Sequence, residues 1–169
     1  MRGKILITGA SGFIGRRLSA RLLADGAQLR CLLRPGSPVP PELSGAETAR
    51  GDLLDKESLK RAADGMNAVF HCAALVRPRG LAVARAGLEK AFFSVNADGA
   101  RNAASAAAAA GAGVFVHLGS IAAQGPGLAL REDSPCAPLT LYGRSKLAGE
   151  DVVRSGLAAS PCRLVTARL

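Results

Sequence analysis

The sequence contains no tryptophan, a single tyrosine and five phenylalanines among its 169 residues. Aromatic residues therefore make up 4% of the chain, although apolar residues in total reach 49%. The core is accordingly expected to consist mainly of Ala, Val and Leu side chains, which suits an α/β protein. The length predicts one domain, residues 1–169, with a sizeable interior.

Cysteine and histidine are also scarce. The four cysteines lie far apart in the chain, at Cys31, Cys72, Cys136 and Cys162. They form no Cys-x-x-Cys pair, and with only two histidines available no metal site is predicted. Most of the cysteines adjoin apolar runs and are interpreted as small buried hydrophobes. Unpaired cysteines favour a reducing compartment, so we expect a cytoplasmic protein.

Long apolar runs and long basic runs are both absent from the sequence. No apolar stretch has the length that a membrane span requires, and the run that ends at Thr8 is too short for a secretory signal. The 22 basic residues exceed the 13 acidic ones, giving a net charge of +9, which favours anionic partners in general. Because the basic residues are scattered, we expect neither a nucleic acid nor a membrane as partner.

A glycine-rich stretch near the N-terminus, TGASGFIG at residues 8–15, follows an apolar run and opens a helical pattern. Gly9 suits a tight turn, Gly12 allows close approach to a pyrophosphate, and Gly15 allows close packing of helix on strand. The phosphates would lie at a helix N-terminus, which favours negative charge. An ordinary strand-to-helix turn is the alternative. We assign cofactor binding to the residues of this loop: Gly9, Ser11, Gly12, Phe13, Ile14 and Gly15.

Apolar runs and helical patterns alternate along the chain. Strands are predicted at 4–8, 29–33, 47–51, 68–74, 114–118 and 163–169. Helices are predicted after the glycine-rich stretch, after Asp55, and over 88–110 and 142–155, with a loop over 119–139. This alternation predicts right-handed βαβ units. We therefore expect an α/β fold of the Rossmann type: a doubly wound parallel sheet of about six strands with helices on both faces.

Two residues at predicted strand ends concern the choice of cofactor. Arg34 follows the second strand, where an acidic residue would accept the ribose 2′-OH of NAD and an arginine accommodates the 2′-phosphate of NADP. No acidic residue occurs nearby until Glu42, which favours NADP over NAD, unless Arg34 simply faces solvent. Asp52 follows the third strand and is suited to accept a hydrogen bond from adenine; a loop aspartate is the alternative.

The only tyrosine of the chain, Tyr142, precedes Lys146 by four residues, which places both on one face of a helix. A phenol ordinarily holds its proton until about pH 10, and a neighbouring cation makes proton loss easier. The pair is therefore suited to acid/base chemistry, with a surface pair as the alternative. Ser120 lies just beyond the fifth strand and is suited to donate to a carbonyl, with local backbone bonding as the alternative.

Three polar residues lie where apolar ones are usual. Asn96 falls within the long predicted helix, where an amide is unfavourable unless it has a partner. We expect it to bond the backbone or a water near the site. His71 and His117 lie in apolar strands and are predicted to be core histidines that bond to the backbone.

Taken in order, these motifs resemble the extended short-chain dehydrogenase/reductases, the NAD-dependent epimerase/dehydratase group. The resemblance covers nearly the whole chain. It rests on six stretches: TGASGFIG at 8–15, GDL at 51–53, FHCAA at 70–74, VNADG at 95–99, LGSIA at 118–122 and YGRSK at 142–146. Six motifs in the family's order are far more specific than any one of them.

The resemblance implies roles for individual residues. Tyr142 corresponds to the catalytic acid/base, Lys146 to its electrostatic partner and ribose ligand, and Ser120 to the group that binds the carbonyl. Cofactor contacts are implied at these further positions: Asp52 and Leu53 at the adenine, Ala73 and Ala74 along the cofactor, and Asn96 beside the site. Arg34 resembles members that prefer NADP, so NADP is the expected cofactor and NAD the second choice.

The implied function is hydride transfer between nicotinamide and a secondary alcohol or ketone, such as a nucleotide-sugar. One alternative is an NADPH-dependent ketone reductase of the dihydroflavonol-reductase-like or hydroxysteroid-dehydrogenase-like branch. The sequence contains no signature that identifies the small-molecule substrate.

This chain departs from the family pattern at two places. Gly119 stands where many members have a second Ser or Thr. Members also continue beyond the strand that ends near Leu169 for roughly as long again, and that part would supply most of the substrate pocket. A non-catalytic NAD(P)-binding or interaction protein is therefore a further alternative. A homodimer through the Ala-rich helix and the Tyr142 helix is also expected.

Overall fold

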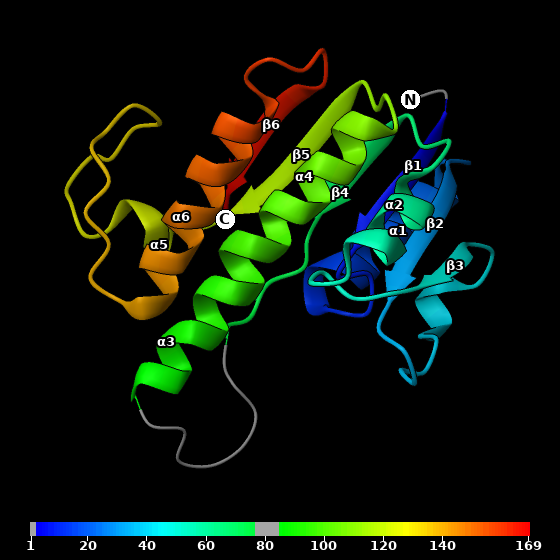
Figure 1. Ribbon diagram of the computed structural model, residues 1–169, viewed down its shortest axis with the longest axis horizontal. Helices are drawn as coiled ribbons and strands as arrows, with labels where there is room; N and C mark the ends of the chain where they lie inside the picture. Colours follow the sequence, from blue (N-terminus) through cyan, green and yellow to red (C-terminus); the bar gives the residue numbers. More distant parts are fainter. Residues whose placement is uncertain (1–2, 77–84) are drawn as a thin grey trace.

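The computed structural model describes residues 3–76 and 85–169. All six strands belong to one parallel sheet in the order β3-β2-β1-β4-β5-β6 (Figure 1). Their bounds are β1 Lys4–Thr8, β2 Gln28–Leu33, β3 Glu47–Arg50, β4 Ala68–His71, β5 Val114–Gly119 and β6 Arg163–Arg168. This is the strand order of the Rossmann fold, so the predicted doubly wound sheet is confirmed.

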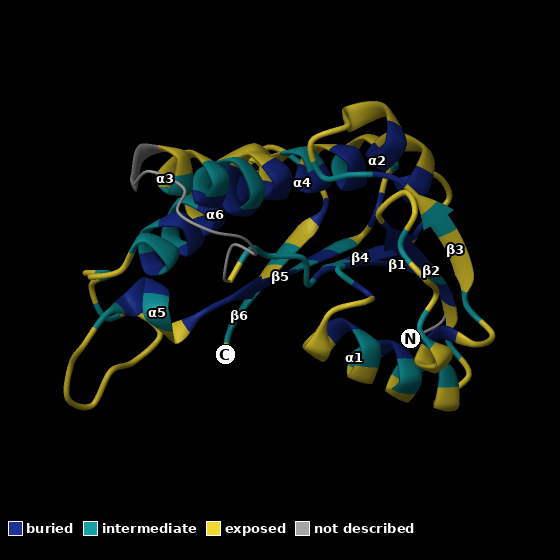
Figure 2. Ribbon diagram, turned by 90° about the horizontal axis from the view of Figure 1, so that it is seen from below, coloured by how far each residue is buried: buried dark blue, intermediate teal, exposed yellow. Residues whose placement is uncertain are grey.

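Helices cover both faces of this sheet. Their bounds are α1 Phe13–Ala24, η1 Pro41–Leu43, α2 Lys56–Ala63, α3 Arg85–Phe93, η2 Ser94–Asp98, α4 Gly99–Ala109, α5 Ile121–Gln124 and α6 Leu141–Leu157. Helix α1 lies on one face, whereas α2, α4 and α6 lie side by side on the other (Figure 2). The Ala-rich helix and the Tyr142 helix therefore share a face, as expected.

Most element boundaries match the predictions, and the differences have local causes. Strand β4 ends at His71 because the following residues leave the sheet and pass against the backbone of Gly9. The predicted loop over 119–139 contains the short helix α5, which Ser120 caps. Helix α6 continues past Gly156 because Leu157 is buried in the core, and this packing outweighs the low helix propensity of glycine.

The predicted helix over 88–110 is built from three segments. Helices α3 and α4 flank η2, a π-helical turn, in which hydrogen bonds span five residues instead of four. Turns of this kind often occur at functional sites. This one contains Asn96, the amide that the sequence placed in an unfavourable helical position.

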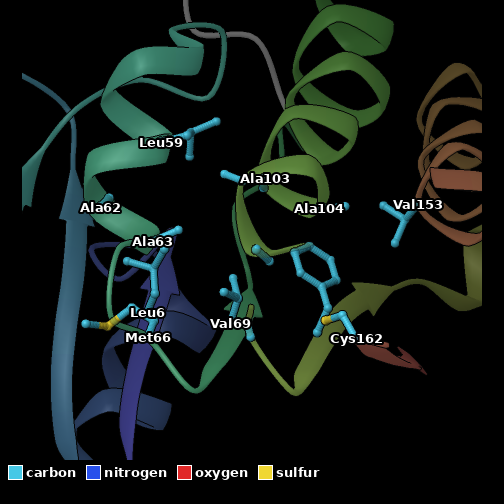
Figure 3. Close-up of a cluster of buried hydrophobic side chains, with 14 of the residues drawn as sticks. Leu6, Leu59, Ala62, Ala63, Met66, Val69, Ala103, Ala104, Val153 and Cys162 are labelled. Atoms are coloured by element: carbon cyan, nitrogen blue, oxygen red, sulfur yellow. The ribbon is translucent and has the colours of Figure 1, made fainter. Parts of the chain in front are cut away.

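The core consists of two apolar clusters, one on each face of the sheet. The cluster beneath α2, α4 and α6 is centred on Phe115 and contains many alanines, among them Ala103, Ala104 and Ala107 of α4 (Figure 3). These small side chains allow α4 to pack closely between its two neighbours. The scarcity of aromatic residues is thus matched by a core rich in alanine, as the composition predicted.

Candidate functional site

The site lies where the carboxyl ends of β1 and β4 adjoin. These two strands are neighbours in the sheet, but the helices that follow them leave to opposite faces (Figure 2). Such a switch point leaves a crevice outside the strand ends, which is where ligands bind in open α/β sheets. Every residue that the sequence assigned to the site follows the carboxyl end of a strand or lies on η2 or α6.

Two glycines of the glycine-rich stretch, Gly9 and Gly15, have no room for a side chain. Gly9 has a φ of +69°, and a Cβ on it would lie 2.5 Å from the backbone nitrogen of Ala73. A Cβ on Gly15 would collide with the carbonyl oxygen of Gly9. Only glycine permits this combination of a positive φ and close backbone contacts.

The N-terminus of α1 is open to an anion. Its N-cap residue, Gly12, offers no side-chain cap, and the first turn carries no acidic residue. Ser11, Phe13 and Ile14 are exposed around it. Unpaired N–H groups at a helix N-terminus favour a negatively charged ligand, so these residues fit the pyrophosphate of a dinucleotide.

The remaining predicted cofactor residues line the same edge of the sheet. Ala73 and Ala74 follow β4 and are half-buried. Asp52 follows β3, and its Oδ1 accepts a hydrogen bond of 2.9 Å from the backbone N–H of Leu54. Leu53 packs against Gly99 at the start of α4. The structure therefore brings the adenine-side residues to the expected edge, where Leu53 also contributes to packing.

Arg34 is exposed directly after β2, and a second arginine that the sequence analysis missed organises its surroundings. Nη1 of Arg50 donates to the carbonyl oxygens of Arg34 and Ser37, at 3.2 and 2.6 Å. Arg50 lies opposite Leu33 in the β2–β3 register, a pairing that the sequence pattern did not provide. Arg34 and Arg50 therefore lie beside each other at the carboxyl ends of β2 and β3.

Tyr142 and Lys146 project from the first turns of α6, which begins after the N-cap residue Thr140. The ring of Tyr142 is half-buried and meets Phe92 edge-on, with centroids 6.3 Å apart. Lys146 is 2% exposed, and its Nζ donates to the carbonyl oxygen of Leu118 at 2.5 Å. Burial lowers the pKa of Lys146 to about 8, against the opposing charge of Glu150, so this lysine is mostly charged at neutral pH.

Ser120 faces α6 from the start of α5. Its Oγ accepts a hydrogen bond of 3.2 Å from the backbone N–H of Ala122, and it lies 3.5 Å from the carbonyl oxygen of Leu169. A side chain on Gly143 would collide with the carbonyl oxygen of Ala122, so α5 and α6 are in close contact. This contact places a hydroxyl, a phenol and an ammonium group on facing elements. Together they could bind an oxygen atom and move a proton.

Asn96 joins two segments at the π turn. Its Oδ1 accepts from the backbone N–H of Leu75 at 2.7 Å, and its Nδ2 donates to the carbonyl oxygen of Leu75 at 3.0 Å and to Oγ of Ser145 at 2.9 Å. Ser145 in turn donates to the carbonyl oxygen of Tyr142 at 2.8 Å. The predicted backbone bonding of Asn96 is confirmed, and it ties the segment after β4 to the helix that carries Tyr142.

His71 and His117 are buried as predicted, but their predicted bonding to the backbone is wrong. Nδ1 of His71 lies 2.8 Å from Oγ1 of Thr8, and the other three ring nitrogens have no partner among the described residues. The rings stack against each other 5.5 Å apart, and Gly149 of α6 covers His117. The hydroxyl of Thr8 replaces a backbone partner for His71, and the packing around His117 leaves no described polar atom within hydrogen-bond distance of its ring. Burial lowers the pKa of His117 to about 3, so its ring is neutral.

The sequence analysis also missed an ion pair between β6 and α6, the helix that carries Tyr142. Glu150 lies one turn after Lys146 on α6, and its carboxylate accepts hydrogen bonds from Nε and Nη2 of Arg168 on β6, at 3.1 and 2.8 Å. The spacing of four residues from Lys146 was visible in the sequence. The arginine, 18 residues farther on, became identifiable only from the pairing of β5 with β6.

Comparison with known proteins identifies the family. Residues 5–169 match the sequence model of the NAD dependent epimerase/dehydratase family. The chain belongs to this family. The resemblance inferred from the six motifs is thereby confirmed for nearly the whole chain.

Relatives within or near the family act on different compounds. The chain is 40% identical over 166 residues to a ceramide reductase from Caulobacter vibrioides, covering 97% of this chain and 45% of that protein. It is 32% identical over 158 residues to a 3-beta-hydroxysteroid dehydrogenase from Mycolicibacterium neoaurum, covering 89% and 42% respectively. The chain thus spans less than half the length of these relatives.

Solved structures show the same architecture. A short-chain dehydrogenase/reductase superfamily protein from Agrobacterium tumefaciens with bound NAD matches with a TM-score of 0.80 at 32% identity, covering 98% of this chain and 48% of that one. MoeE5 in complex with UDP-glucose and NAD matches with a TM-score of 0.80 at 27% identity, covering 98% and 54%. Among residues 3–76 and 85–169, none of the helices has the length and apolar character needed to cross a bilayer.

Proposed function

We propose that this chain is the cofactor-binding and catalytic part of an NAD(P)-dependent oxidoreductase that acts on a secondary alcohol or ketone. The observation that carries the proposal is the meeting of two structures at one edge of the sheet. One is the glycine loop with its open helix N-terminus, and the other is α6, which carries Tyr142 and Lys146 and contacts α5 through Gly143. When bound, the nicotinamide ring would accept or supply the hydride.

In this proposal the chain's own side chains handle the oxygen and the proton. Ser120 donates a hydrogen bond to the substrate oxygen, and Tyr142 exchanges a proton with it. The ammonium group of Lys146, protonated at neutral pH because its pKa is about 8, favours the negative charge that develops on the phenol oxygen. Asn96 and Ser145 hold the backbone of α6 at Tyr142.

The proposed test of this role is Tyr142→Phe, which keeps the ring against Phe92 and removes only the hydroxyl. Loss of the acid/base group should lower turnover by about 10²–10⁴-fold, while NADPH affinity stays within twofold of the unchanged protein. Turnover is followed by nicotinamide absorbance, and binding by calorimetry. Unchanged turnover would remove Tyr142 from the chemistry. Binding of the cofactor without any turnover in the wild-type protein would favour the non-catalytic alternative.

NADP is the proposed cofactor, with NAD as the second choice. The support is Arg34 after β2 together with Arg50 at the end of β3, and no acidic residue occurs between Leu33 and Glu42. The solved relatives described above contain NAD, which supports the dinucleotide itself. The proposed contacts are those of the sequence analysis: Gly9, Ser11, Gly12, Phe13, Ile14, Gly15, Arg34, Asp52, Leu53, Ala73, Ala74, Asn96 and Lys146.

For the substrate, two classes are considered. MoeE5, solved with UDP-glucose, supports a nucleotide-sugar. The ceramide reductase and the hydroxysteroid dehydrogenase support a lipid alcohol or ketone. The described residues favour the second class, because Ile121, Leu130 and Leu139 expose 64, 41 and 74% of their surface on the segment that joins Ser120 to α6.

These classes are separated by offering the protein a 3β-hydroxysteroid, a ceramide and UDP-glucose with each nicotinamide cofactor. Oxidation of the steroid or conversion of the ceramide would support the lipid class. Turnover of UDP-glucose alone would support the nucleotide-sugar class. It would contradict the lipid class inferred from exposed Ile121, Leu130 and Leu139.

Two further proposals concern the setting of the protein. A cytoplasmic location is supported by the four cysteines, all of which are free thiols, because unpaired cysteines favour a reducing compartment. A homodimer through α4 and α6 is proposed because the two helices share one face of the sheet (Figure 2), although the alanines of α4 are buried within the core. A monomer in light scattering at high protein concentration would contradict the dimer.

A further inference from the structure

The ion pair between Glu150 and Arg168 is buried on the carboxylate side. The side chain of Glu150 is fully buried, whereas that of Arg168 retains 18% of its exposure. A buried carboxylate is costly unless it is paired and hydrogen-bonded. Here the guanidinium approaches through both Nε and Nη2, a planar arrangement that fixes the carboxylate in place.

Gly119 makes room for this carboxylate at the end of β5. A Cβ on Gly119 would lie 2.5 Å from Oε1 of Glu150 and 3.1 Å from Cγ of Arg168. The departure from the family's second Ser or Thr therefore has a physical account. The residue directly before Ser120 lacks a side chain, and the carboxylate of Glu150 occupies the space beside it.

Glu150 is also the acid next to the catalytic lysine. Residues four apart on a helix lie on the same face, and both Lys146 and Glu150 are almost completely buried. The other titratable groups whose charge bears on Lys146 are Cys72 and the two stacked histidines of β4 and β5.

None of these other groups is an anion at neutral pH. Burial raises the pKa of the Cys72 thiol to about 12 and lowers that of His117 to about 3. Burial also holds the pKa of His71 well below its usual range. Tyr142 lies on the same helix, and Arg168 faces Glu150 from β6. Among the described residues, Glu150 therefore supplies the negative charge that opposes desolvation of the Lys146 ammonium.

We propose that Glu150 is a positioning residue that keeps Lys146 protonated, and that Arg168 and the space left by Gly119 hold its carboxylate in place for this task. The inference rests on the proposed function only in that it gives Lys146 a role in the chemistry. The contacts within the buried group do not depend on that role. Arg168 also donates to Sγ of Cys136 at 3.4 Å, which connects the segment after α5 to the same group.

The decisive experiment is an NMR titration of the Lys146 side chain in protein labelled with ¹³C at lysine. The signal of Lys146 is identified by its loss in Lys146→Met. Glu150→Gln keeps the shape and one acceptor for Arg168 but removes the charge. It should lower the pKa of Lys146 by about one unit, since it removes an opposite charge that lies one helical turn away.

A matched control is Asp151→Asn, which removes the next carboxylate of α6. Asp151 is exposed and pairs with Arg154, so the pKa of Lys146 should not change. Gly119→Ser provides a second route, because it displaces the carboxylate without removing it, and it should also lower the pKa of Lys146. Thermal unfolding of each variant shows whether the fold is retained.

An unchanged pKa of Lys146 in folded Glu150→Gln would overturn the inference. In turnover, the lowered pKa should appear as an equal downward shift of the limb of the pH profile that reports Lys146. Absence of turnover in the wild-type protein would contradict the proposed function and leave the titration intact, so the two failures are distinguishable.

Discussion

The two sides of the site are built in opposite ways. On the β1 side, the glycine loop forms a binding surface from backbone alone, and its important positions are those where a side chain would collide. On the β5 and α6 side, the surface depends on buried polar side chains that bond to one another, such as Lys146, Glu150 and Asn96. Backbone surfaces depend on local spacing, whereas buried side-chain groups depend on contacts between distant segments.

The largest effect is expected where a side chain is added to the backbone surface. Gly15→Val places atoms against the carbonyl oxygen of Gly9 and against Cα of Ala10. Overpacking of this kind should cost about 3 kcal/mol of unfolding free energy and abolish NADPH binding. Denaturant unfolding and calorimetry measure the two effects.

Gly156→Ala is the matched control, because a Cβ there meets open space on α6. Alanine is favoured over glycine in a helix by about 1 kcal/mol, so this variant should be as stable as the parent or more so. If Gly15→Val bound NADPH normally, the backbone surface would not be the pyrophosphate site.

A more specific test concerns two side chains at the neighbouring strand ends, Arg34 after β2 and Arg50 of β3. Arg34→Ala should weaken NADPH binding by about tenfold to a hundredfold, since a hydrogen bond to a charged group contributes about 1.5–3 kcal/mol. Arg50→Ala should have a similar but smaller effect through the turn that it holds. NADH affinity should not change in either variant, and exposed Arg61 of α2 offers a control. Equal losses for both cofactors would contradict NADP selectivity.

The buried side chains on the β5 and α6 side of the site should make the free energy of unfolding depend on pH. His117 has a folded-state pKa of about 3, whereas an unfolded histidine titrates near 6.5. Between these values the unfolded chain binds more protons, so stability should fall by about 1.4 kcal/mol per pH unit as the pH is lowered from about 6 towards 3. His117→Phe keeps the stacking on His71 and should reduce that slope, measured by urea unfolding at several pH values. An unchanged slope would contradict a buried neutral His117.

The same contrast explains what the sequence could predict. The glycine loop, the alternation of strands and helices and the Tyr142–Lys146 pair follow from residues close together in the chain, and their positions were predicted correctly. The partner of His71, the arginine behind Arg34 and the pairing of Glu150 with Arg168 each join different strands or helices. Such contacts depend on sheet register, which periodicity does not provide. The π turn was missed because it lies inside a continuous helical pattern, and the unfavourable amide of Asn96 does not by itself indicate an extra residue in the turn.

The π turn changes the direction in which side chains point from the two halves of one continuous helix. An extra residue in the turn rotates everything before it by about 100° relative to everything after it. The alanines of α4 can therefore face the sheet while Phe92 of α3 reaches the ring of Tyr142. Removing one residue from 94–98 would restore a regular helix and swing Phe92 away from the tyrosine. We therefore expect that the extra residue of the π turn orients α3 so that Phe92 contacts Tyr142.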